Sequence, residues 1–344
     1  MINLIFKTFS FDAPIILNYL LAFSFSFCLV MFLMPRFIKI MNFYKIGEDV
    51  RDLKIDYSLK KRIPPMGGLV IVFSVIFSYL FFSTLKTKLS FVLPLFYILF
   101  AVIGAMDDYI KIKGKKSGLK ALFKMLGQSI ICLILFFTFI YKGSYKVIMP
   151  FNLNFPFINQ NYIYLGAFLF FIFIFFVVSG TSNAVNLTDG LDGLASLSLL
   201  TNFVFIFVYV LTKNNSYNQD WIEIAIFSSS IIGATLGFIW YNGYPAQIFM
   251  GDIGSLSYGG ILGILFVLIR QELALPLVGI VFFIETFSVI LQRSYKLLTG
   301  KKLFKLTPVH HHYELNGIHE NKIVLRSFII SLFSFIFSMF LLLL

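Results

Sequence analysis

The sequence predicts an all-α integral membrane protein with about ten transmembrane helices. Of its 344 residues, 59% are hydrophobic and 13% are charged, whereas a soluble domain carries about 25% charged residues. Several apolar runs reach the length of about 20 helical residues that a hydrocarbon core of about 30 Å requires. The alternation of apolar and polar residues that is typical of outer-membrane barrels is absent, so helices are the expected way to satisfy the backbone in lipid.

Ten apolar segments are the predicted spans. In chain order they cover residues 15–34, 66–85, 91–106, 121–141, 162–181, 193–212, 221–240, 255–270, 273–292 and 323–343. The first segment is too long for a signal peptide and is followed by "PRFIKI" rather than a small-residue cleavage site, so we expect it to be retained. Because no long linker separates the segments, we expect residues 1–344 to form a single polytopic domain.

The positive charges orient these spans. Residues 35–63, 107–124 and 293–326 hold eight, six and seven of the 28 Lys and Arg residues. With ten spans, all three segments fall on one side, which the positive-inside rule makes cytoplasmic. Both termini are then expected on the outer side of the membrane. The net charge of +12 is not expected to bind nucleic acid, because the lysines adjoin the spans.

Three shorter features complete the expected architecture. The outer loop 143–161 has β-prone residues between turn formers, which favours a short periplasmic hairpin. The inner loop 293–322 is long enough for a short amphipathic helix. Cys28 and Cys132 each lie inside an apolar run without a metal-ligand spacing, so we expect them to be packing residues.

Three carboxylates stand at the predicted inner ends of different helices. Asp107 and Asp108 follow one span, and Asp252 lies between two glycines just before another. Carboxylates at a membrane edge are costly unless a positive group joins them. Mg²⁺ binds through one or two carboxylates plus substrate phosphates, so we expect a magnesium site here. Adjacent helical residues point about 100° apart, so Asp107 and Asp108 are expected to have different roles.

Two other polar clusters lie on the predicted inner side. In "SGTSNAVNLTDGLDGLA", the spacing of three between Asn183, Asn186, Asp189 and Asp192 places all four on one face of a helical or near-helical turn. We expect this ladder to bind a ligand, since helix capping would explain only one or two of its members. The run His310, His311 and His312 suits a phosphate or a sugar. Structural zinc is the alternative, with only His319 as a further nitrogen ligand.

Several motifs carry a resemblance to a known family. "PPMGG", "DDYIK", "NAVNLTDGLDGLA", "MGDIGSLS", "FFIETFSVILQ" and "HHHYEL", in this order, resemble the phospho-N-acetylmuramoyl-pentapeptide transferases, a branch of the polyprenyl-phosphate N-acetylhexosamine-1-phosphate transferases. The resemblance covers nearly the whole chain. It implies Mg²⁺-dependent transfer of phospho-N-acetylmuramoyl-pentapeptide from its UDP derivative to undecaprenyl phosphate, which gives lipid I and UMP. This is the first membrane step of peptidoglycan synthesis, and it serves cell wall biogenesis, cell shape and cell division.

The resemblance also implies roles for individual residues. Asp107, Asp108 and Asp252 match the catalytic carboxylates and metal ligands, with Asp252 the best ligand. The positions that hold the nucleoside are Lys60, Asn186, Asp189, Asp192, Asn242 and Phe249, the last stacking on uracil. The positions around the sugar and phosphates are Ser255, Gln292, His310, His311 and His312. Lys111 and Lys124 match basic positions near the diphosphate or the lipid phosphate.

The chain departs from the family pattern at two places. Ile63 and Pro65 replace two threonines, and Asp56-Tyr57 replaces a Ser-His pair, so contacts made by those hydroxyls and that imidazole are in question here. Direct in-line attack by the lipid phosphate is the simplest mechanism, and a phospho-aspartate intermediate stays open. The identity of the third residue in the accepted peptide and the formation of a homodimer also stay open.

Two alternative functions are weighed against this one. The first is a UDP-GlcNAc:undecaprenyl-phosphate GlcNAc-1-phosphate transferase. The second is a transporter, which would place ionisable groups near the bilayer midplane, where Glu285 is the main acid.

Overall fold

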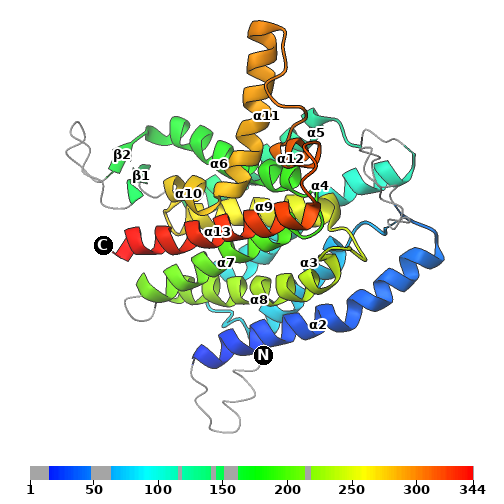
Figure 1. Ribbon diagram of the computed structural model, residues 1–344. Helices are drawn as coiled ribbons and strands as arrows, with labels where there is room; N and C mark the ends of the chain where they lie inside the picture. Colours follow the sequence, from blue (N-terminus) through cyan, green and yellow to red (C-terminus); the bar gives the residue numbers. More distant parts are fainter. Residues whose placement is uncertain are drawn as a thin grey trace. The chain divides into compact units, whose positions relative to one another are not determined.

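The computed structural model describes residues 15–47, 63–114, 118–140, 145–150, 162–213 and 218–343, nearly all of them helical (Figure 1). The chain divides into two compact units. One consists of residues 1–119 and 202–257, and the other of residues 120–201 and 258–344. Each unit is described by itself. The expectation of a single domain over 1–344 stays a prediction.

The first unit is built on α8 (Gln219–Asn242), which packs against α2 (Ile15–Phe43), α3 (Gly68–Phe82) and α4 (Leu89–Ile112). Small side chains let these helices approach closely, as is common between membrane helices. The Ser229 hydroxyl donates to the Tyr19 carbonyl at 2.6 Å, and a Cβ atom at Gly233 would meet the backbone of α2. The contacts between α2 and α8 therefore depend on small residues in α8.

A buried carboxylate ties the end of α3 to α8. Glu223 is fully buried and accepts hydrogen bonds from the hydroxyls of Tyr79 and Ser83, both at 2.7 Å, and from the Thr84 backbone at 2.9 Å. The Thr84 hydroxyl is a fourth donor. A buried charge is tolerated when it is fully hydrogen-bonded, so Glu223 fixes the start of the connection between α3 and α4.

The second unit contains more helices than the first among the described residues. They are α5 (Ala121–Leu135) with its π-helical extension η1 (Phe136–Ile140), α6 (Gly166–Thr188), the 3-10 turn η3 (Glu272–Ala274), α10 (Leu275–Val278), α11 (Ile280–Thr299), α12 (Val309–Glu314) and α13 (Glu320–Leu343). Two helices run from one unit into the other: α7 (Leu194–Lys213) and α9 (Gly251–Leu268). Within the second unit, α6 packs against both α5 and α11.

The expected hairpin is present, with a different second strand. β1 (Lys146–Ile148) pairs antiparallel with β2 (Tyr162–Tyr164). β2 lies beyond the predicted loop and inside the predicted span 162–181, because "YIY" is β-prone and α6 begins only at Gly166, where φ is +71°. The short helix expected in 293–322 is α12, and α11 continues past the predicted end at residue 292.

The helical multi-pass membrane fold is confirmed. Within the described ranges, eight helices are long and apolar enough to cross a membrane: α2, α4, α5 with most of η1, α6, α7, α8, α9 and α13. The pair formed by Glu272–Val278 and Ile280–Thr299 is bent by 88° and would make a ninth span. The shorter α3 is the tenth apolar segment. The count of ten and the outer position of both termini stay predictions.

Candidate active site

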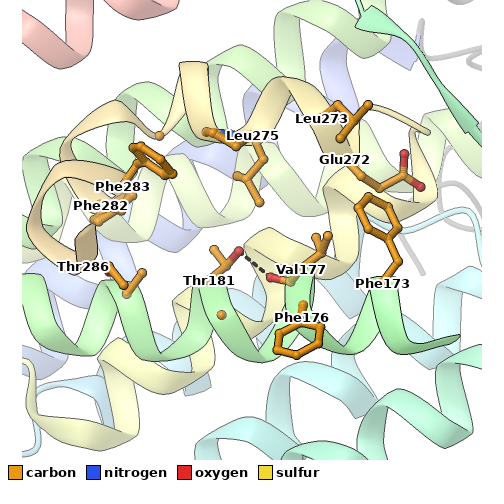
Figure 2. A pocket seen from close by; sticks show the side chains of 14 residues that line it. Phe173, Phe176, Val177, Thr181, Glu272, Leu273, Leu275, Phe282, Phe283 and Thr286 are labelled. Carbon is orange, nitrogen blue, oxygen red and sulfur yellow. Dashed lines mark hydrogen bonds between the residues drawn. The ribbon is translucent and has the colours of Figure 1, made fainter. Parts of the chain in front are cut away.

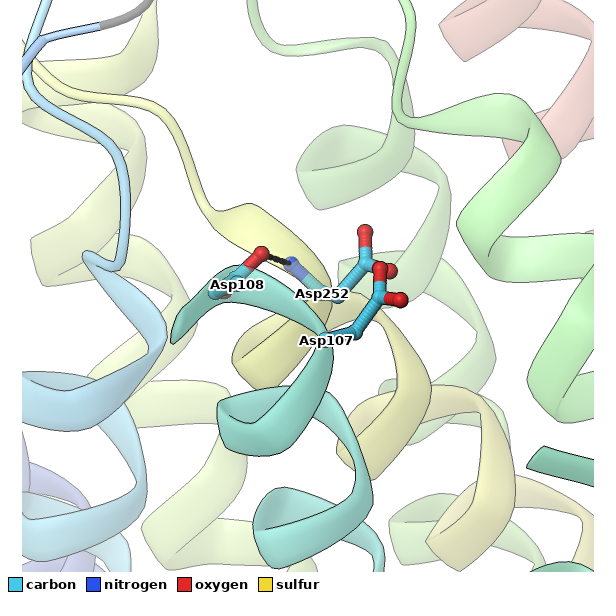
Figure 3. Close-up of side chains that lie close together, drawn as sticks. All are labelled: Asp107, Asp108 and Asp252. Carbon is cyan, nitrogen blue, oxygen red and sulfur yellow. Dashed lines mark hydrogen bonds between the residues drawn. The ribbon is translucent and has the colours of Figure 1, made fainter. Parts of the chain in front are cut away.

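The three aspartates predicted from the sequence lie together in the first unit (Figure 3). Asp107 and Asp108 belong to the last turns of α4, and Asp252 to the first turn of α9. All three are buried, and one oxygen from each lies within 4.8 Å of the others. The helices meet closely at Gly104, where a Cβ atom would collide with the Asp252 backbone. The cluster therefore depends on direct contact between α4 and α9.

Asp108 caps the helix that carries Asp252. Its Oδ1 accepts a hydrogen bond from the Asp252 N–H at 3.0 Å, and its Oδ2 accepts one from the Ile253 N–H at 3.1 Å. The first N–H groups of a helix have no partner within the helix, and a negative charge is favourable there. Both oxygens of Asp108 are thus engaged in holding the start of α9.

Asp107 has different partners from its neighbour. The Lys111 Nζ atom lies 2.8 Å from Asp107 Oδ2 and 3.0 Å from Asp252 Oδ1. Asp107 Oδ1 also accepts a hydrogen bond from the Leu119 N–H. The Lys111 ammonium therefore bridges the carboxylates of Asp107 and Asp252, and it offsets their mutual repulsion.

Two segments that are far apart in the sequence, residues 63–68 and 249–251, form one wall beside Asp252. The Phe249 N–H donates to the Pro64 carbonyl, the Gly67 N–H to the Phe249 carbonyl and the Gly68 N–H to the Met250 carbonyl, each at 2.9 Å. At Gly251, where φ is +75°, a Cβ atom would lie 2.7 Å from Asp108 Oδ2. Only glycine therefore fits between the "PPMGG" segment and the cap of α9.

Both departures in the "PPMGG" region belong to this wall. Ile63 and Pro65 are buried, so apolar side chains pack where the family pattern has hydroxyls. The other departure, Asp56-Tyr57, and the predicted nucleoside residue Lys60 lie outside the described residues.

The remaining predicted residues of the first unit lie near the wall. Asn242 is buried and its Nδ2 donates to the Ile248 carbonyl at 3.0 Å, which closes the loop before α9. Phe249 is half-buried within that loop. The buried Ser255 hydroxyl donates to the Gly251 carbonyl at 3.1 Å. Asn242 and Ser255 thus support the loop, while Phe249 keeps part of its ring exposed.

The asparagine–aspartate ladder in the second unit is not one continuous helical face. Asn183 and Asn186 lie in α6, but the helix ends at Thr188, with Asp189 as its C-terminal cap. Asp192 lies in the turn that follows. The expectation from the spacing of three is therefore wrong for the second half of the ladder, because the glycine-rich sequence after Asp189 breaks the helix.

Neighbouring elements hold both halves of the ladder. The Asn183 amide donates to the Ser179 carbonyl at 2.8 Å and to Gln128 Oε1 of α5 at 3.1 Å. The Asp192 N–H donates to Glu320 Oε1, at the start of α13, at 2.7 Å. Asn183 thus contributes to the contact between α5 and α6, and Glu320 anchors the turn.

The two remaining predicted residues outside the histidine run lie in α5 and α11. Lys124 is half-buried in the first turn of α5. Gln292 of α11 uses its Oε1 to accept the backbone N–H groups of Leu303 and Phe304, both at 2.9 Å. Gln292 therefore shapes the loop that leads from α11 to α12.

His310 is held by a carboxylate that the sequence analysis did not assign to the site. Its Nδ1 lies 3.0 Å from Glu285 Oε2, which also accepts the His310 backbone N–H at 3.3 Å. Because the partner is a carboxylate, we assign the proton to Nδ1. His310 is 1% exposed, its Nε2 has no hydrogen-bond partner, and a Cβ atom at Gly190 would collide with the ring. Glu285 thus directs Nε2 toward the Gly190 turn.

The next two histidines have partners of their own. His311 Nδ1 lies 2.7 Å from Glu314 Oε2, and His312 Nδ1 accepts the Lys305 N–H at 3.1 Å. In the part of the chain that the structure describes, the one group of three or more acidic, histidine or cysteine side chains that could hold a metal is the aspartate cluster. Glu314 could have been predicted as the partner of His311 from their spacing of three residues. Glu320 could not have been predicted as the partner of Asp192, because the two residues are far apart in the sequence.

The chain matches one protein family and several named proteins over most of its length. The family described as glycosyl transferase family 4 matches residues 89–270, more than half of the chain. A phospho-N-acetylmuramoyl-pentapeptide-transferase of Buchnera aphidicola subsp. Baizongia pistaciae is 41% identical over 332 residues, which cover 92% of this chain and 95% of the relative. The chain belongs to the phospho-N-acetylmuramoyl-pentapeptide transferases.

Further relatives support the same membership. The phospho-N-acetylmuramoyl-pentapeptide-transferase of Fusobacterium nucleatum subsp. nucleatum is 40% identical over 330 residues, or 93% of this chain and 91% of the relative. That of Francisella philomiragia subsp. philomiragia is 39% identical over 325 residues, or 90% and 88%. The resemblance seen in the motifs is therefore confirmed, and the N-acetylglucosamine branch is not favoured. The matched region 89–270 includes all three aspartates.

Proposed function

We propose that this transferase moves phospho-N-acetylmuramoyl-pentapeptide from its UDP derivative to undecaprenyl phosphate, forming lipid I and releasing UMP. The observation that carries the proposal is the pair of buried carboxylates Asp107 and Asp252, bridged by Lys111 at the ends of two membrane helices. They lie in a chain that is 41% identical to a named transferase over 92% of its length. The positive-inside distribution of Lys and Arg supports a site that faces the cytoplasm from the inner membrane. A homodimer stays a prediction.

The donor set of the cluster fits a hard divalent cation. Its three carboxylates offer only oxygen ligands, which suit Mg²⁺ better than the softer metals, and one oxygen from each already lies within 4.8 Å of the others. Asp107 and Asp252 would hold the ion, because Asp108 already uses both oxygens on the α9 backbone. A bound Mg²⁺ would supply positive charge to the phosphates of the substrates.

The chain's own residues divide the remaining work. Phosphoryl transfer needs mainly positioning and charge stabilisation. Lys111 is the mobile positive group, since its ammonium is within 3.0 Å of two carboxylates and 30% of its side chain is exposed. It can turn from them toward an arriving phosphate. Asp108 is the positioning residue that fixes the Asp252 backbone, and this role argues against Asp108 as a nucleophile. Direct in-line attack by the lipid phosphate is therefore our proposed mechanism.

The binding of the substrate is assigned to two groups of residues. The half-buried ring of Phe249 is proposed to stack on uracil. Asn186, Asp189 and the Nε2 atom of His310 are proposed to contact the nucleotide-sugar part, because Asn186 and Asp189 lie at the end of α6 and the His310 ring lies against the Gly190 that follows.

The proposal is tested by product analysis with the full chain purified in detergent. The chain receives undecaprenyl phosphate with either UDP-N-acetylmuramoyl-pentapeptide or UDP-N-acetylglucosamine, and lipid products are separated by chromatography. We expect a lipid-linked product and equimolar UMP only with the muramoyl-pentapeptide substrate. Product only with UDP-N-acetylglucosamine would move the chain to the other branch, and no product with either would reject the assignment.

A further inference from the structure

The second unit contains a cavity of about 320 Å³ between α6 and the segment that leads through η3 and α10 into α11 (Figure 2). Most of its lining is apolar and aromatic, with Phe173, Val177, Leu275 and Phe282 among the lining residues. Its volume is at the lower end of small-ligand pockets, which are about 300–1,000 Å³. The cavity can therefore take the head or the first part of a chain of a lipid, and not a whole lipid.

A buried acid without a partner lines this cavity. Glu272 is 2% exposed, and neither oxygen of its carboxyl group has a hydrogen-bond partner. This differs from Glu223, the buried carboxylate of the first unit, which accepts four hydrogen bonds. Leaving a polar group buried and unpaired costs free energy. Glu272 is therefore a polar group that a ligand could satisfy.

A half-buried cation, Arg270, lies two residues before this acid. The Nη1 atom of Arg270 is buried without a hydrogen-bond partner, and its guanidinium carbon lies 5.6 Å from the centre of the Phe170 ring. Arg270 and Glu272 do not form an ion pair with each other in the described structure. A guanidinium with one unpaired, buried nitrogen and an unpaired, buried carboxyl group thus lie two residues apart in the connection that follows α9.

Two exposed aromatic residues border the cavity. Phe176 and Phe283 line it and are 67% and 45% exposed, on α6 and α11, two helices of the membrane fold. The connection between α9 and α10 follows a membrane span, and this is the level at which lipid head groups lie. An occupant would therefore come from the bilayer rather than from water.

We propose that this cavity binds a zwitterionic phospholipid with a primary ammonium head group, such as phosphatidylethanolamine. Arg270 pairs with the lipid phosphate, Glu272 accepts hydrogen bonds from the ammonium group, and the start of an acyl chain packs against Phe173 and Phe282. A polyprenyl phosphate carries no cation for Glu272. A choline head group carries a positive charge but no N–H donor, so it satisfies Glu272 less well.

The test compares lipids that differ only in the head group. Purified full chain is titrated with phosphatidylethanolamine or phosphatidylcholine of identical acyl chains, and bound lipid is counted by native mass spectrometry. We expect phosphatidylethanolamine to bind about tenfold more tightly, at the lower end of what hydrogen bonds to charged groups contribute. Equal binding of the two lipids would overturn the proposal, and this comparison needs no variant.

Three variants locate the effect. Glu272→Gln should remove most of the preference for phosphatidylethanolamine, and Arg270→Gln should weaken both lipids alike, since both carry a phosphate. Asp220→Asn is the matched control, because Asp220 is an exposed acid in the first turn of α8 and should leave the preference unchanged. A preference that survives Glu272→Gln, or undiminished binding of both lipids to Arg270→Gln, would show that these side chains do not form the site.

Discussion

Both carboxylate oxygens of Asp108 accept backbone N–H groups from the first turn of the helix that carries Asp252, at 3.0 and 3.1 Å. The position of Asp252, the proposed catalytic carboxylate, therefore depends on another carboxylate, which need not touch the substrate. This relationship separates the roles of the adjacent residues Asp107 and Asp108.

The Asp108→Asn substitution tests that role. An amide offers one acceptor oxygen and no charge to the α9 N-terminus, so we expect the variant to lose about 1–3 kcal/mol of stability, as is usual for hydrogen bonds to buried charged groups. Thermal unfolding of the variant in detergent measures this, with Asp220→Asn as the control acid. Unchanged stability would show that the cap is unimportant.

The Asp252→Asn substitution separates chemistry from binding. The amide keeps the shape of the side chain but removes the charge that pairs with Lys111 and weakens any metal ligation. We predict loss of turnover with UMP affinity retained, measured by product formation and by calorimetric titration. Near-normal turnover in a folded variant would remove Asp252 from the catalytic group.

The Phe249→Ala substitution tests nucleotide stacking. Stacking of a base on an aromatic ring is worth about 1–3 kcal/mol, which is about 5- to 150-fold in affinity. We expect UMP and nucleoside inhibitors to lose affinity in this range while the Asp252→Asn variant keeps it. If UMP bound Phe249→Ala as tightly as the unmodified chain, the uracil assignment would fail.

Two substitutions at Glu285 test its hydrogen bond to His310. Glu285→Ala should release the imidazole and raise KM for the UDP substrate or lower kcat, because Nε2 is no longer directed at the Gly190 turn. Glu285→Gln keeps an acceptor oxygen for Nδ1–H and should recover part of the loss. Nitrogen NMR of labelled histidine should show the Nδ1–H tautomer of His310 in the unmodified chain. The Nε2–H tautomer, or equal activity of both variants, would contradict the positioning role.

Hydropathy and motif order were enough to predict much of this protein. The apolar runs predict the membrane helices, because lipid requires long apolar segments with internally satisfied backbones. The placement of Asp107, Asp108 and Asp252 at helix ends predicts their cluster. Hydropathy does not show that α3 is short. Nor does it show that the chain bends by 88° before α11, because Gly279 lies within an otherwise apolar stretch.

Other features depend on contacts between distant parts of the chain. Lys111 is four residues from Asp107, so their pair follows from helix geometry, but its contact with Asp252 requires α4 and α9 to meet. Glu285 stood out in the sequence only as a deep acid, since its partner His310 lies on another helix. The strict spacing of the ladder predicted one helical face, but the chain leaves the helix after Thr188.

The dependence of UMP release on a divalent cation is the most direct test of the central claim, that the carboxylate cluster of Asp107 and Asp252 performs metal-assisted phosphoryl transfer. The full chain in detergent is assayed with UDP-N-acetylmuramoyl-pentapeptide and undecaprenyl phosphate, first with EDTA and then with excess Mg²⁺ or Mn²⁺. We predict no UMP release in EDTA and full recovery with either ion. Full activity in the presence of the chelator would contradict the account.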